Sequence, residues 1–191
     1  MNGTKGKAGA LGTTLEVATP GSLLAQAGLV AAAVGLPVAA HLGGAPVRML
    51  LPMHWPVILA GLVFGWRGGL AVGALAPTAS FLISGYPLPP VLVQMSLELA
   101  TYGAVAGWLR ERARTSGFLA VATALVAGRI VFIASTLVLS GATTATFGYL
   151  RAALLPGVVA AVVQTGTLPL LADRWTSSGQ GRGSRPAGTG E

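Results

Sequence analysis

The chain alternates between long apolar runs and short polar or Gly/Pro-rich stretches. Six runs are apolar enough to form membrane helices: residues 22–40, 55–66, 69–84, 91–109, 118–139 and 152–171. A helix needs about 20 apolar residues to cross a bilayer. The second run has only about a dozen, so it spans the membrane only with help from flanking residues or a tilted, partly re-entrant neighbour. The pattern predicts an all-α integral membrane protein with a bundle of six transmembrane helices.

Both ends of the chain are polar and rich in small residues. Residues 1–20 are Gly/Thr-rich, and residues 176–191 are rich in Gly, Ser, Arg and Pro. Such segments bury too little apolar surface to fold alone, so we expect two disordered tails around a membrane domain at 21–175. The first apolar run is too long for the hydrophobic part of a signal peptide, and we interpret it as the first span.

The basic residues give the orientation of this bundle. If the N-terminus is cytoplasmic, the outer loops contain only Arg48 and Arg151, and Arg129 lies within a span. The inner segments then contain the other nine basic residues: Lys5, Lys7, Arg67, Arg110, Arg112, Arg114, Arg174, Arg182 and Arg185. Because cytoplasmic segments carry an excess of Lys and Arg, we expect both termini in the cytoplasm and the protein in the cell membrane.

Composition narrows the function classes. The chain is 53% hydrophobic and 9% charged, against roughly 25% charged residues in soluble domains. It contains no cysteine and two histidines, which excludes disulfides and thiolate sites and argues against a metal centre. The net charge of +7 is explained by basic residues that meet anionic lipid. No basic stripe with interleaved aromatic residues accompanies it, so we expect no nucleic-acid partner.

Two ionisable residues, Glu98 and Arg129, fall inside predicted spans. Each is costly in a bilayer, by about 2.5–3.5 kcal/mol or more, so a partner or a polar cavity is expected. Glu98 lies ~12 Å and Arg129 ~15 Å from the outer ends of their consecutive, antiparallel helices, which permits an ion pair. One interpretation is a structural pair that fixes helix packing. In the other, one or both residues face a ligand cavity, where Arg129 holds an anionic substrate group.

Four small residues lie at four-residue spacing on one face of the first helix: Ala27, Ala31, Gly35 and Ala39. Small residues let a second membrane helix approach closely. The face is therefore either packed inside the bundle or a docking surface for a separate membrane subunit.

The outer segment 41–54 contains Gly, Pro, Arg48 and His54, followed by Trp55. Either Trp55 belongs to an interfacial belt and His54 is a solvated loop residue, or the segment is a lid over an outward-facing pocket. Several catalytic and nucleotide-binding motifs are absent: the P-loop, HExxH and GxSxG. We therefore expect no enzyme activity, no catalytic residue, no cofactor and no ATPase of its own.

Three stretches resemble the substrate-binding S component of an energy-coupling-factor (ECF) transporter: LPMHWPVILAGLVFGWRGGLAVGALAPTASFLISGYPLPP (51–90), LELATYGAVAGWLRER (97–112) and LVAGRIVF (125–132). In that family a short second helix leads into a glycine-rich turn, which here is GLVFGWRGGLAVG (61–73). The resemblance covers roughly residues 22–172.

The resemblance implies a six-helix subunit of an ECF-type ABC importer. Such a subunit captures a vitamin or related micronutrient from outside and delivers it with a transmembrane T component and two ATPases. It also implies that the small-residue face of the first helix docks to the T component and that segment 41–54 is a gate. The implied substrate-binding residues are His54, Glu98, Arg129, Arg151 and Gln164. Two other classes stay open: a scaffolding membrane protein without cargo, and a stand-alone secondary transporter with Glu98 as its ion site.

Overall fold

The computed structural model describes residues 14–183, and this part of the chain is all-helical, with no strand. The helices are α1 (Pro20–Leu42), α2 (Val47–Leu50), α3 (His54–Ser84), α4 (Pro89–Glu111), α5 (Gly117–Ser140) and α6 (Thr144–Gly183). Four of them are long and apolar enough to cross a membrane: α1, α3, α5 and α6. The chain is therefore an all-α membrane protein, as the apolar pattern predicts.

Helix α3 reverses direction at Gly65. This glycine has φ 74° and ψ −174°, a backbone conformation that lacks a penalty only for glycine. A Cβ atom added to Gly69 would lie 2.7 Å from the Cα of Gly61, although eight residues of a straight helix span ~12 Å. We call the two halves α3a (54–64) and α3b (66–84). They correspond to the second and third apolar runs of the sequence.

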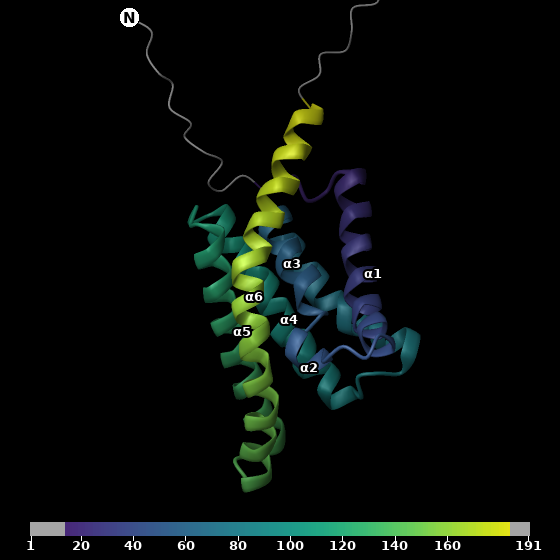
Figure 1. The fold of residues 1–191 in the computed structure, drawn as a ribbon, viewed down its shortest axis with the longest axis vertical. Helices are drawn as coiled ribbons and strands as arrows, with labels where there is room; N and C mark the ends of the chain where they lie inside the picture. Colours follow the sequence, from purple (N-terminus) through teal and green to yellow (C-terminus); the bar gives the residue numbers. More distant parts are fainter. Residues whose placement is uncertain (1–13, 184–191) are drawn as a thin grey trace, which may run out of the picture.

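Helix α4 packs against both halves of α3 through backbone contacts between glycines. A Cβ atom on Gly103 would collide with the carbonyl group of Gly69, and one on Gly61 would collide with the carbonyl oxygen of Gly103. One turn further along α4, Gly107 lies in the same way against Gly65. Glycines at four-residue spacing let helices approach to backbone contact. In Figure 1, α3 and α4 accordingly lie at the centre of the bundle, with α1 at one edge.

Polar contacts close the end of the bundle where α4 finishes. The backbone N–H of Trp66 donates to Glu111 Oε2 at 3.3 Å, so α4 caps the first turn of α3b. Arg110 is buried and forms an ion pair with Asp173 of α6. The N-terminal approach to α1 is tied to this end as well, because the N–H of Leu15 donates to the Val63 carbonyl at 2.7 Å.

Some boundaries differ from those the sequence predicts. Helix α6 continues to Gly183, so residues 176–183, expected in the C-terminal tail, are helical. Helix α4 has 23 residues but is not one of the four apolar spans, since it carries Gln94, Glu98 and Arg110. Lys5, Lys7 and Arg185 lie outside the described residues.

The glycine contacts predict the effect of a single methyl group. We expect Gly103→Ala to destabilise the protein by at least about 1–3 kcal/mol, because backbone atoms of α3 must move to admit it. Thermal unfolding in detergent measures this change. Gly28→Ala on α1 is the control, since a Cβ there meets nothing within 4 Å. An unchanged melting temperature for Gly103→Ala would show that the helices separate easily at this point.

Candidate ligand-binding site

A cavity of about 530 Å³ lies toward one end of the bundle, between the first residue of α3, the early turns of α4 and α6 and the middle of α5. Its wall is mostly apolar and contains four polar or charged side chains, His54, Gln94, Glu98 and Arg129, beside the aromatic Tyr149. The other lining residues are Leu51, Val91, Met95, Phe132, Ala152 and Ala153. Mostly apolar pockets of 300–1,000 Å³ with a few converging polar groups are typical of small-molecule sites.

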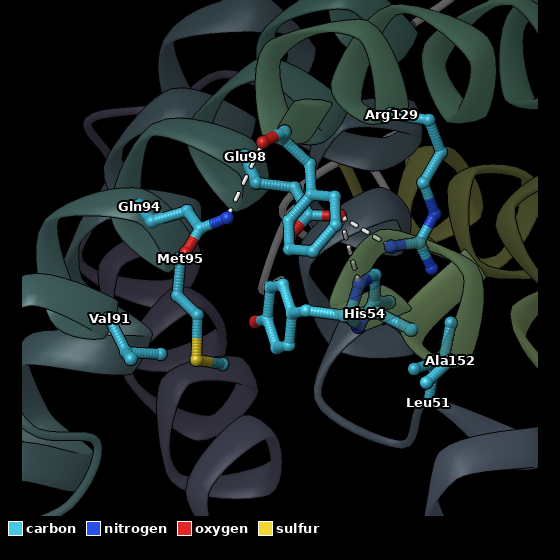
Figure 2. A pocket seen from close by; sticks show the side chains of 11 residues that line it. Leu51, His54, Val91, Gln94, Met95, Glu98, Arg129 and Ala152 are labelled. Atoms are coloured by element: carbon cyan, nitrogen blue, oxygen red, sulfur yellow. Dashed lines mark hydrogen bonds and ion pairs between the residues drawn. The ribbon is translucent and has the colours of Figure 1, made fainter. Parts of the chain in front are cut away.

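The Glu98 carboxylate is the centre of the polar wall. Its Oε1 accepts a hydrogen bond from Arg129 Nη1 at 2.9 Å and another from the Tyr102 hydroxyl at 2.6 Å. The ion pair that the matched depths of Glu98 and Arg129 permit is therefore present. The Glu98 side chain is 5% exposed and that of Arg129 is 22% exposed, so the carboxylate is the more deeply buried member of the pair. Figure 2 shows His54 and Arg129 approaching Glu98 from two other helices.

His54, the first residue of α3, is buried beside this pair. Its Nε2 lies 3.9 Å from Glu98 Oε1, and its ring packs 5.1 Å from the Tyr102 ring, measured between centroids. Neither ring nitrogen has a hydrogen-bond partner in the described part of the chain. The interpretation of His54 as a solvated loop residue is therefore wrong, because the reversal of α3 brings its first turn against α4.

Gln94 is the fourth polar residue of the cavity wall, and it is held in place by α5. Its Nε2 donates to the Phe132 carbonyl at 3.3 Å and to the Thr136 hydroxyl, both on α5. Gln94, Glu98 and Tyr102 are four residues apart, so they share one face of α4. This spacing is the sequence signal that identifies Gln94 and Tyr102 as companions of Glu98, and neither was among the predicted site residues.

The remaining wall combines aromatic and aliphatic surface. The rings of Phe132 and Tyr149 lie 6.1 Å apart, and the Arg129 guanidinium lies 5.7 Å from the Phe132 ring. Segment 43–53 connects α1 to α3 and contributes one residue to the cavity wall, Leu51. Leu51 ends α2 in a left-handed conformation with φ 45°. The segment is held in place by a hydrogen bond of 2.9 Å from Trp55 Nε1 to the Leu50 carbonyl.

Two glycines make room for the large polar side chains. A Cβ atom on Gly157 of α6 would lie 2.7 Å from Arg129 Nη2, and one on Gly128 of α5 would collide with the Tyr102 ring. Because Gly128 and Gly157 have no side chain, the Tyr102 phenol and the Arg129 guanidinium can occupy these positions beside Glu98. Within residues 14–183 no group of three or more His, Asp or Glu side chains could hold a metal ion.

A family profile described as ECF transporter, substrate-specific component, matches residues 22–171. The chain belongs to this family. It is therefore a substrate-specific membrane component of a transporter, in agreement with the resemblance of the sequence. The match covers all the residues that line the cavity. Neither a curated protein nor a solved structure matches the chain.

Three of the five predicted substrate-binding residues of this ECF component line the cavity, and two do not. His54, Glu98 and Arg129 line one cavity. Arg151 is exposed on α6, and its neighbour Ala152 faces the cavity instead. Gln164 is fully buried, but it lies 11 residues, or ~16 Å, along α6 from the lining residue Ala153. Arg151 and Gln164 therefore lie outside this site.

The small-residue face of α1 lies on the outside of the bundle. Ala27, Ala31, Gly35 and Ala39 are all exposed, while Leu29 and Ala33 turn toward the core. The interpretation that this face packs within the bundle is wrong for this chain. An exposed row of small residues is instead available to a helix of another subunit.

The Glu98–Arg129 pair predicts an asymmetric response to neutralisation. We expect Arg129→Gln to destabilise the empty protein by about 3–5 kcal/mol, because it leaves a buried carboxylate without its cation. Glu98→Gln leaves a more exposed guanidinium, so its effect is smaller. The double variant should be more stable than Arg129→Gln alone.

Thermal unfolding of the three variants in detergent tests this cycle. Arg151→Gln is the control, since it removes an exposed arginine of α6 and should leave the melting temperature unchanged. Strictly additive effects of the two single changes would show that the two residues do not interact.

Proposed function

We propose that the protein is the substrate-binding S component of an ECF-type ABC importer. It captures a vitamin or related micronutrient from outside the cell and delivers it together with a transmembrane T component and two ATPases. The observation that carries this proposal is the cavity around Glu98 and Arg129. Ionisable residues inside a membrane bundle are candidates for a functional site, and here the pair borders a space of small-molecule size.

The topology we propose has six spans: α1, α3a, α3b, α4, α5 and α6. The reversal at Gly65 supports counting α3 twice. Polar residues of α4 are turned toward partners rather than lipid, since Gln94, Glu98 and Arg110 are all buried. With six spans, both termini lie on one side, which we assign to the cytoplasm of a plasma-membrane protein.

The distribution of arginines supports a cavity that opens outward. Arg67, Arg110, Arg112, Arg114 and Arg174 lie at the end of the bundle where α3 reverses and α4 finishes. The cavity lies toward the other end, beside the first residue of α3 and the early turns of α4 and α6. Because basic residues collect on the cytoplasmic side, the cavity faces the outside and segment 43–53 lies at its mouth.

Labelling of single cysteines tests this topology, since the natural chain contains none. Leu42→Cys and Tyr86→Cys are expected to react with an impermeant thiol reagent added to intact cells, and Arg67→Cys is expected to react only after permeabilisation. All three positions are exposed in the structure. Labelling of Arg67→Cys from outside would contradict the double span of α3, and labelling of all three in the reverse sense would invert the orientation.

The α1 face supports a T component as the partner. Ala27, Ala31, Gly35 and Ala39 leave a row without large side chains on the surface that points away from the bundle. Glu98 argues against a stand-alone secondary transporter, since its charge is already balanced by the Arg129 guanidinium, which lies where a bound cation would be repelled. A cargo-free scaffold leaves the polar cavity unexplained.

Co-purification tests this assembly. The tagged chain, co-expressed with the T component and ATPases of its own organism, should retain them. We expect Ala31→Trp to abolish the retention because the indole holds the helices apart. Val126→Trp on the exposed face of α5 is the matched control and should retain the partners. Equal retention in both variants would mean that α1 is not the docking face.

A further inference from the structure

The charges of Glu98 and Arg129 in the cavity wall cancel. Of the acidic and basic side chains that line it, Glu98 and Arg129 form an ion pair of 2.9 Å, and His54 is the third. A ligand anion placed on Arg129 would also lie beside the Glu98 carboxylate, and a ligand cation placed on Glu98 would lie beside the guanidinium. In a site walled by apolar side chains, such like-charge contacts are poorly screened.

In contrast to the charges, the hydrogen-bonding groups of the cavity wall are not all paired, and both donors and acceptors remain available to a ligand. Within residues 14–183, the guanidinium of Arg129 makes one hydrogen bond, to Glu98, which leaves further N–H donors at the cavity. Both hydrogen bonds to Glu98 use Oε1, so Oε2 stays available as an acceptor. Gln94 donates its amide N–H groups to α5, so its carbonyl oxygen is the group available to a ligand.

The rest of the wall fits a flat apolar body. Phe132 and Tyr149 contribute aromatic surface to the cavity wall, and Met95 contributes an adaptable thioether. In Figure 2, Val91 and Met95 lie on one side of the cavity, and Leu51 and Ala152 lie on the other. A ring system between these sides would point one edge at Gln94, Glu98 and Arg129.

We propose, on the basis of the function proposed above, that the ligand is an uncharged planar heterocyclic micronutrient. Its polar edge presents both N–H or O–H donors and carbonyl or ring-nitrogen acceptors to Arg129, Glu98 and Gln94. The site rejects phosphorylated forms of the same ring, because a phosphate near Arg129 lies against the Glu98 carboxylate. Arg129 therefore acts through directed N–H donors rather than as an unmatched positive charge.

Compounds that differ in charge but share a ring test the proposal. The wild-type protein, purified in detergent, is titrated with riboflavin, pyridoxine and nicotinamide and with their anionic counterparts, riboflavin 5′-phosphate, pyridoxine 5′-phosphate and nicotinate. Thiamine and pantothenate provide a cation and an anion without a neutral partner. We expect one neutral compound to bind and its anionic counterpart to bind at least about 100-fold more weakly. Tighter binding of any charged compound would overturn the proposal.

The variant Glu98→Gln shows whether charged compounds are rejected because of their charge or because of their size. In Glu98→Gln the cavity keeps its shape but gains a net positive charge, so the preference for the neutral compound should shrink by at least about tenfold. Arg151→Gln removes a charge outside the cavity and should leave the preference unchanged. An unchanged preference in Glu98→Gln would show that the phosphate is rejected by size and would contradict our proposal. If Glu98→Gln does not fold, the wild-type comparison still decides.

The same titrations keep the two proposals apart. If a charged compound binds best, the charge argument fails while the assignment as a micronutrient-binding subunit stands. If none of the eight compounds raises the melting temperature of the wild-type protein, the planar heterocyclic ligand is contradicted, while the assembly with a T component is decided separately by the co-purification.

Discussion

Close backbone contact between α3 and α4 is the constraint on which the rest of the structure depends. Gly103 touches Gly61 before the reversal of α3 and Gly69 after it, so a single glycine of α4 lies between the two halves of one helix. In lipid, helices gain little from hydrophobic exclusion, and such close packing is a main source of their association. The contact fixes the height and rotation of α4, and thereby which face of α4 turns toward α5.

The rotation of α4 brings the residues of the candidate site together. With Gly103 and Gly107 directed at α3, the neighbouring face with Gln94, Glu98 and Tyr102 turns toward α5 and the first turn of α3. Arg129, Phe132 and Thr136 of α5 meet it there. Gly128 lets the Tyr102 ring lie close against α5, and Gly157 leaves space for the guanidinium. The polar groups are therefore held by a rigid backbone rather than by loops, which is the condition for directed recognition of a small ligand.

The sequence predicts those features that follow from a local pattern or from the nature of the bilayer. Apolar runs locate the helices, and the high energy of a charge in lipid predicts that Glu98 and Arg129 find partners. Features that depend on which face of one helix meets another are not visible in a single sequence. The burial of His54, the α5 partners of Gln94, and the space left by Gly157 are of this kind. The resemblance to the family implied Arg151 and Gln164, but the rotation of α6 leaves Arg151 exposed, and Gln164 lies too far along α6 from the lining residue Ala153.

The location of the Glu98–Arg129 pair indicates why it is present. A buried ion pair adds little stability compared with apolar residues of the same volume, so helix packing alone gives no reason to prefer it. The pair of Arg110 and Asp173 at the other end has a structural reason, because it joins α4 to α6 with the Asp173 side chain half exposed. Glu98 is deeply buried, yet its pair borders an open cavity rather than a filled core. A hydrogen-bonded pair at that place presents donors and acceptors of fixed direction without net charge. Packing of the bundle does not require that arrangement, and we therefore infer that it serves the recognition of a ligand.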